Sequence, residues 1–193
     1  IVTTEGTAED PEDFTTTTTT VTIPAGETSV SVDIPVTEDV IDEDDETFTV
    51  NGTVTTTNTD NTDPSGTVTI VDNDGTPVVT IEDVTVNEGD GTVTVPVTLS
   101  NPSDEDTVIN IVTTEGTAED PEDFTTTTTT VTIPAGETSV SVDIPVTEDV
   151  IDEDDETFTV NGTVTTTNTD NTDPSGTVTI VDNDGTPVVT IED

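Results

Sequence analysis

The chain has 193 residues, of which 45 are Asp or Glu and none is Lys, Arg or His, so its formal net charge is −45. This charge excludes nucleic-acid binding, which rests on Lys and Arg, and it opposes insertion into anionic membranes. The absence of Cys excludes disulfides and thiolate metal sites, and no apolar run is long enough to span a membrane. Hydrophobic residues are only 27% of the chain, a composition typical of disorder. Most of them, however, are Val, Ile and Phe at strand spacing, which favours a folded chain provided that a cation is present.

An internal repeat sets the organisation of the chain. Residues 1–83 recur without a change as residues 111–193, so the period is 110 residues. A period of this size fits a whole domain rather than a short helical or propeller repeat. We predict a complete repeat over 76–185, preceded by a partial repeat over 1–75 that lacks its first strands. Residues 186–193 are expected to be the first strand of a further repeat, in a longer array that acts as a stalk.

Alternating apolar residues predict strands throughout the complete repeat. Residues 92–99 place Val93, Val95, Val97 and Leu99 on one face, and residues 140–146 alternate in the same way. Turn-forming Gly, Pro, Asn and Asp separate these runs, and no segment holds a helical period. About seven short strands of this kind predict an all-β, antiparallel sandwich. Further inward-facing pairs are Ile109 with Ile111, Val131 with Ile133, Phe158 with Val160, and Val178 with Ile180.

Three local features qualify this pattern. Pro96 and Pro145 lie within predicted strands, and proline cannot donate to a strand ladder, so we expect edges or bulges there. Residues 125–130 are all Thr, which we interpret as a loop that passes into an exposed strand; a glycosylated, mucin-like patch is the alternative. Asn161-Gly162-Thr163 matches a glycosylation sequon, but Asn-Gly is also typical of a hairpin turn, which is the preferred interpretation.

The carboxylates are clustered rather than spread. Seven fall between Val146 and Phe158, and smaller groups lie at Glu88 and Asp90, in residues 119–123, and at the end of the repeat. Loops at one end of a sandwich converge, so these groups can meet and supply the six to eight oxygens that Ca²⁺ prefers, for about two ions. The alternative is that they are solvated acidic loops. An EF-hand is disfavoured, because Thr157 and Thr163 stand where its Gly and Glu are needed.

Catalysis is not expected. The chain has no His or Cys, and its Ser and Thr residues have no base to activate them. Paired carboxylates can hydrolyse glycosides, but there is no Trp or Tyr to form a platform for a sugar ring. We therefore predict that the chain is not an enzyme.

The order of several segments resembles the Calx-beta domain. The resemblance spans the whole 110-residue repeat, and it implies an immunoglobulin-like β-sandwich, in tandem copies, with calcium bound at one end. The matching segments are Val86-Asn87-Glu88-Gly89, Thr114 to Phe124, Ile133-Pro134-Ala135-Gly136-Glu137, Glu148-Asp149, Glu153 to Phe158, and Thr179 to Asp184.

The resemblance also implies the calcium ligands. Asn183 and Glu148 depart from the family pattern, which has acidic and Asp residues there, and the partial repeat lacks a counterpart of Glu88. In the complete repeat the implied ligands are Glu88, Asp123, Glu148, Asp149, Glu153, Asp182 and Asp184. In the partial repeat they are Asp13, Glu38, Asp39, Glu43, Asp72 and Asp74.

Three functions are weighed. Identical tandem copies without a basic residue look like the giant adhesins and filaments of bacterial cell surfaces, so the first hypothesis is a secreted, calcium-stabilised spacer that contacts its neighbouring repeats. The alternative is an adhesive module that binds a cell-surface or glycan ligand through its acidic loops, or a self-assembling sheath subunit. Equal dimensions with and without calcium would count against the spacer.

Overall fold

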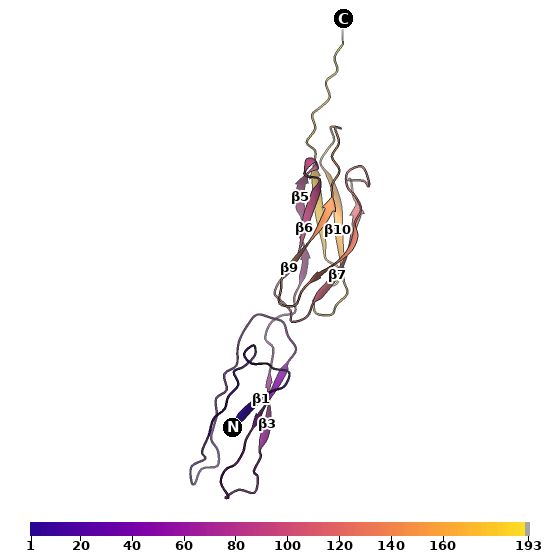
Figure 1. The fold of residues 1–193 in the computed structure, drawn as a ribbon. Helices are drawn as coiled ribbons and strands as arrows, with labels where there is room; N and C mark the ends of the chain where they lie inside the picture. The colour runs from indigo at the N-terminus through magenta and orange to yellow at the C-terminus, as the bar shows by residue number, and fades with distance from the viewer. Residues whose placement is uncertain (192–193) are drawn as a thin grey trace. The chain divides into compact units, whose positions relative to one another are not determined.

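The computed structural model describes residues 1–191, and the chain divides into two compact units, Ile1–Asp74 (unit 1) and Gly75–Asp193 (unit 2) (Figure 1). The described part of the chain is built from strands and contains a single turn of 3-10 helix, Glu88–Asp90. Within that part, no helix is long and apolar enough to cross a membrane.

Unit 2 is a sandwich of two sheets. Its larger sheet has the strand order β5-β11-β10-β7-β8, and its smaller sheet has the order β4-β6-β9. The strands are β4 (Val79–Ile81), β5 (Val84–Asn87), β6 (Thr92–Leu99), β7 (Thr107–Glu115), β8 (Thr128–Ile133), β9 (Ser139–Pro145), β10 (Glu156–Val164) and β11 (Ser175–Val181).

The predicted alternation decides which side chains enter the core of unit 2. In β6, Val93, Val95, Val97 and Leu99 are buried between the sheets, while the residues between them face outward. Burial of these apolar side chains is the main term that stabilises the sandwich. The expected all-β, immunoglobulin-like sandwich is therefore confirmed, with eight strands instead of about seven. All pairings are antiparallel except that of β5 with β11, which is parallel.

The structure corrects two local predictions. Asn161 and Gly162 do not form a turn, because both lie inside the continuous strand β10. A Cβ on Gly162 would lie 2.9 Å from Pro174 and 3.0 Å from Ile81, so glycine is needed there for close packing. Pro96 lies in the central strand of its sheet rather than at an edge.

The proline in β6 is tolerated because its neighbour leaves the sheet at that point. The last paired residue of β4 is Ile81, opposite Val97, and the next residue donates its N–H to the Pro96 carbonyl. Pro145 ends β9, an edge strand, as expected. The Thr run also behaves as predicted, because residues 125–127 form a loop and β8 begins at Thr128.

Unit 1 contains one small antiparallel sheet of three strands. These are β1 (Val2–Glu5), β2 (Glu46–Asn51) and β3 (Ser65–Ile70), in the order β1-β2-β3. The buried apolar cluster consists of Ala8, Phe14 and Phe48, and the two phenyl rings stack with centroids 4.2 Å apart. The same ring pair occurs in unit 2, where Phe124 and Phe158 stack at 4.1 Å.

The C-terminal segment of unit 2 leaves the sandwich after β11. Residues 186–191 form no strand, and Figure 1 shows the chain running clear of both sheets. Val188, Val189 and Ile191 are 86%, 90% and 93% exposed, respectively. The prediction that residues 186–193 form the first strand of a further repeat stays a prediction. Residues 192–193 of this segment lie outside the described part of the chain.

Candidate metal centres

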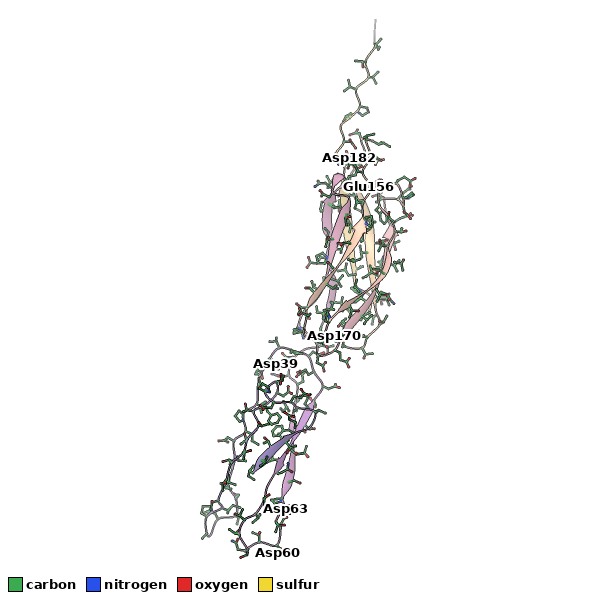
Figure 2. The ribbon with its side chains drawn as sticks, in the orientation of Figure 1. Asp39, Asp60, Asp63, Glu156, Asp170 and Asp182 are labelled. Atoms are coloured by element: carbon green, nitrogen blue, oxygen red, sulfur yellow. The ribbon has the colours of Figure 1, made fainter. Side chains whose placement is uncertain are left out.

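The acidic loops of unit 2 meet at one end of the sandwich. Figure 2 shows Glu156 and Asp182 together at this end, whereas Asp170 lies at the opposite end. Glu156 begins β10, and Asp182 directly follows β11, the neighbouring antiparallel strand. Strand pairing therefore brings together carboxylates that are distant in sequence.

The first cluster, called centre A, consists of Glu88, Asp149 and Asp184. One carboxylate oxygen from each lies within 4.8 Å of the others. Glu88 is supplied by the 3-10 turn after β5, and only 7% of its surface is exposed. Its Oε1 accepts a hydrogen bond of 2.8 Å from the Asp149 N–H, which fixes the start of the acidic loop.

The turn that carries Glu88 is shaped by its neighbours. Asp90 Oδ2 accepts the Asn87 N–H at 3.1 Å, so Asp90 caps the turn and does not face centre A. Gly91 ends the turn with φ of 72°, a left-handed conformation that favours glycine. Local turn chemistry thus places the Glu88 carboxylate at the edge of the core.

The second cluster, centre B, consists of Asp123, Glu153 and Glu156, with the same 4.8 Å limit. Asp123 Oδ2 accepts the Glu119 N–H at 2.7 Å, which closes a short turn just before the fully buried Phe124. Glu156 lies two residues before the buried Phe158, so the inward alternation of β10 turns its carboxylate toward Asp123.

In each centre, two of the three carboxyls are hard to ionise. Burial raises the pKa of Glu156 to about 7, assisted by a hydrogen bond with Asp123 and by repulsion from nearby carboxylates. Burial, followed by repulsion from neighbouring carboxylates, also raises the pKa of Glu153 and of Asp184. For Glu88, burial raises the pKa against the opposing effect of the Asp149 N–H. The sites therefore favour a bound cation, whether a proton or a metal.

Two buried oxygens at this end make no hydrogen bond. Asp182 Oδ1 and Asp184 Oδ2 are buried and have no hydrogen-bond partner among the described residues. A buried polar atom without a partner is costly, and such atoms call for an ion or a water. Carboxylate oxygens are the ligands that Ca²⁺ prefers, so the residues present fit this ion.

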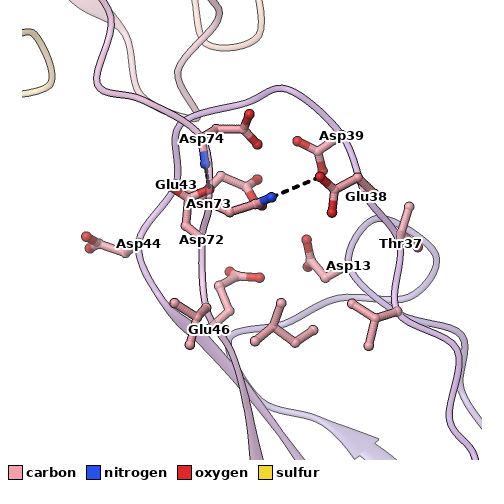
Figure 3. Close-up of a pocket in the computed structure, with 13 residues that line it drawn as sticks. Asp13, Thr37, Glu38, Asp39, Glu43, Asp44, Glu46, Asp72, Asn73 and Asp74 are labelled. Carbon is pink, nitrogen blue, oxygen red and sulfur yellow. Dashed lines mark hydrogen bonds between the residues drawn. The ribbon is translucent and has the colours of Figure 1, made fainter.

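Unit 1 repeats centre B but not centre A. Asp13, Glu43 and Glu46 bring their carboxylate oxygens within 4.8 Å, and they are the counterparts of centre B. Figure 3 shows this group in a cleft of about 280 Å³, with Asp44 pointing away. Burial, followed by repulsion from Asp72, raises the pKa of Asp74 in the same cleft.

One amide-to-carboxylate hydrogen bond is shared by both units. Asn183 Nδ2 donates to Glu148 Oε2 at 3.0 Å, and Asn73 Nδ2 donates to Glu38 Oε1 at the same distance, as the dashed line in Figure 3 shows. The two positions that depart from the family pattern are thus hydrogen-bonded to each other. This amide replaces one carboxylate and relieves repulsion at the rim of each cluster.

The structure brings most of the predicted ligands together. In unit 2, the two centres contain Glu88, Asp123, Asp149, Glu153 and Asp184. Glu148 and Asp182 lie outside them, although Asp182 holds one of the unpartnered oxygens. In unit 1, all six predicted residues line the cleft: Asp13, Glu38, Asp39, Glu43, Asp72 and Asp74.

Sequence reasoning missed one residue in each unit. Glu156 and its counterpart Glu46 complete their clusters, but neither was among the predicted ligands. The alternation of β10 contained the signal, because an acidic residue at an inward position before Phe158 must face other polar groups. The same holds for Glu46 before Phe48 in β2.

Comparison with known proteins adds a family match. The sequence model of the Calx-beta domain matches residues 1–74 and residues 72–184 of this chain. No curated protein sequence matches the chain. Both matched segments include the acidic loops described above.

Solved structures of similar domains were also found. The apo-form Calx CBD1 domain is 22% identical, covers 57% of this chain and 100% of its own, and has a TM-score of 0.47. The calcium binding domain CBD12 of CALX1.1 is 21% identical over 55% of this chain and 44% of its own, with a TM-score of 0.48.

Proposed function

The chain belongs to the Calx-beta family, as its sequence resemblance predicted, and from this premise we propose that it is a calcium-stabilised spacer in a long extracellular adhesin or filament. The chain is non-catalytic in this proposal, and its partners are neighbouring identical repeats. We retain the repeat frame of 76–185 for the complete repeat, with 1–75 and 186–193 belonging to its neighbours. The location is a bacterial cell surface.

The observation that carries the proposal is a pair of unpartnered buried oxygens, one on Asp184 of centre A and one on Asp182. Asp182 Oδ1 and Asp184 Oδ2 lie at an end of the sandwich where no basic residue of this chain can compensate them. Burial of uncompensated carboxylates is costly, so a divalent cation would stabilise the folded state. In the proposed function, Glu88, Asp149 and Asp184 hold one calcium ion, and Asp123, Glu153 and Glu156 hold another.

Bound calcium would then act as a staple for the loops. The chain has no disulfide, and centre A joins the turn after β5 to the loops that precede β10 and follow β11. Neutralising part of the charge lowers self-repulsion, while the remaining negative charge favours an extended array. Both effects favour a spacer, which must be stable and extended, over a module that recognises a ligand.

Thermal unfolding of residues 76–185 tests the proposal. We expect a calcium-selective rise in Tm relative to excess EDTA, with magnesium as the control ion, because a ligand of the folded state stabilises it by about 2.7 kcal/mol at a hundred times its Kd. The variant Asp184→Asn should lose most of this rise, whereas Asp170→Asn at the opposite end should keep it. An identical melt in calcium and in EDTA would contradict the proposal.

A further inference from the structure

The two sheets of unit 2 have four edge strands, and three of them are protected against further pairing. β4 has only three residues, and β5 has four and leads directly into the 3-10 turn. β9 carries Asp143 and Pro145 at exposed positions. Short strands, charges and prolines are the features that keep an edge from pairing with another chain. The fourth edge strand, β8, has none of these features.

β8 is an uncharged strand of six residues with the sequence Thr-Thr-Thr-Val-Thr-Ile. Thr, Val and Ile all favour strands. Residues 124–136, which include β8 and its flanks, contain no Asp or Glu, although 45 of the 193 residues of the chain are acidic. A strand that approaches this edge therefore meets no charge on β8 itself.

The main chain of β8 is hydrogen-bonded on one side only. Just before β8, the Thr113 N–H donates to the Thr127 carbonyl at 3.0 Å, and hydrogen bonding alternates along an antiparallel pair. Every second residue of β8 therefore bonds to β7. The main-chain N–H and C=O groups of the residues between, Thr128, Thr130 and Thr132, point away from β7. Within the described part of the chain these groups have no hydrogen-bond partner.

The side chains of β8 leave this edge accessible. Thr128, Thr130 and Thr132 are all exposed. Thr130 Oγ1 donates to Asn110 Oδ1 of β7 at 2.8 Å, so this side chain lies over its own sheet. On the inner face, Val131 is only partly buried and packs against the core. An added strand would therefore cover Val131 as well as pair with the main chain.

We propose that β8 of one chain pairs antiparallel with β8 of a second copy of this chain, so that the two five-stranded sheets join into one. The two-fold axis passes between the two Thr130 residues, and Thr128 of each copy lies opposite Thr132 of the other. The outward main-chain groups of the edge are then all bonded, and threonines face each other across the strands. The same patch serves in both copies, so the contact closes as a dimer.

The chemistry of the edge favours a second copy over an unrelated partner. A basic protein would be attracted to the acidic loops of the sandwich rather than to an edge without charge. β8 is itself an uncharged strand of high β-propensity, so it fits the edge that it forms. If repeats stand in tandem, as proposed above, each repeat adds one such edge, and several weak contacts can act together. The pairing itself requires neither calcium nor an array.

Sedimentation velocity of the 193-residue chain tests the proposal. Two copies of formal charge −45 repel each other, but at about 1 M salt the Debye length falls to roughly 3 Å. We therefore expect a monomer of 20.0 kDa at low salt, and a dimer at high salt and high protein concentration. The series is run in calcium and in EDTA, and circular dichroism identifies the conditions in which the chain is folded.

A proline at the edge should prevent pairing while the fold is kept. Thr130→Pro deletes an N–H that has no partner in the single chain, but the dimer loses the hydrogen bonds about its axis and should weaken at least about tenfold. Ser141→Pro is the matched control, because its N–H also points outward, from the edge strand β9 in which Pro145 already stands. This control should dimerise like the parent chain.

Cross-linking tests the register of the pair. The chain has no Cys, so Thr130→Cys introduces a single thiol, whose Cα would lie about 5.5 Å from that of its symmetry mate. In high salt, a short bismaleimide should link Thr130→Cys into a dimer at least about tenfold faster than Thr80→Cys, at an exposed position of β4.

Three results would overturn the proposal. They are dimerisation that persists in Thr130→Pro, equal cross-linking of the two Cys variants, and a folded monomer at every salt and protein concentration. If Thr130→Pro does not fold, the two Cys variants still decide the outcome. None of these results bears on calcium binding, which is measured separately by the shift in Tm.

Discussion

The two units contain the same 74-residue stretch, yet they fold it differently. Residues 128–133 and 139–145 form β8 and β9 in unit 2, whereas their counterparts, 18–23 and 29–35, form no strand in unit 1 beyond an isolated bridge at Thr18. In unit 2, β9 pairs with β6 and β8 pairs with β7. Unit 1 has no counterpart of β6 and only the last part of β7. A strand therefore depends on its partner as much as on its own sequence.

The burial of apolar side chains also depends on the presence of partner strands. Twenty apolar residues form the core cluster of unit 2, but only three are buried together in unit 1. Because hydrophobic burial scales with the area removed from water, unit 2 has far more stabilisation per residue than unit 1. The comparison teaches that the first strands of a repeat carry much of its stability.

Hydrogen exchange should reveal the largest difference between the units. A peptide from residues 128–145 is identical to one from residues 18–35, so mass spectrometry should detect one peptide with two isotope envelopes. We expect exchange of the unit 2 copy to be at least about a thousandfold slower, because its amides open only with global unfolding. A single envelope at all times would show that both copies are equally protected.

Truncation of the stacked phenylalanines should affect the stability of the two units differently. Phe158→Ala is expected to lower the stability of unit 2 by about 3–5 kcal/mol, because it opens a large cavity in a packed core. Phe48→Ala, its counterpart, should leave the main unfolding transition of unit 2 unchanged. Denaturant unfolding measures both variants, and equal destabilisation by the two would contradict the division into separate units.

Removal of Glu88 should make the acidic end of unit 2 resemble that of unit 1. Glu88→Gln keeps an acceptor for the Asp149 N–H but removes one charge from centre A. If the centres bind calcium, isothermal titration should show one ion fewer per chain, or one site weakened by at least about tenfold. The control is Asp170→Asn, at the opposite end of unit 2. An unchanged stoichiometry and affinity would exclude Glu88 as a ligand.

The smallest expected effect is on the pH dependence of stability. The pKa of Glu156 is about 7 in the folded state and ordinarily 4.5, so the folded state binds more protons between these values. In EDTA, stability should therefore increase as the pH falls from about 8 to about 5, and decrease as the pH rises through 7. Glu156→Gln should flatten this profile. In calcium the stabilisation should shrink at low pH, since protons compete for the same oxygens.

Much of the fold could be predicted from local pattern. The alternation in residues 92–99 identified β6 and its buried face, and the exact repeat identified two related units. The turn predicted at Asn161-Gly162 was wrong. Glycine is needed at position 162 because Pro174 and Ile81 pack closely against it, not because the chain turns there. Such contacts join residues far apart in the chain, so a local pattern cannot reveal them.

The sequence by itself determined the chemistry of the candidate centres. A chain with clustered carboxylates and no basic residue must find its counter-charge outside itself. Only the tertiary structure decided which carboxylates meet: β10 and β11 pair at the acidic end, which adds Glu156 to centre B and leaves two oxygens of Asp182 and Asp184 without partners. It also decided that Val79 and Ile81 are buried in β4 whereas Val189 and Ile191, in a segment of the same sequence, are exposed, because burial is set by neighbouring strands rather than by the residues of the segment.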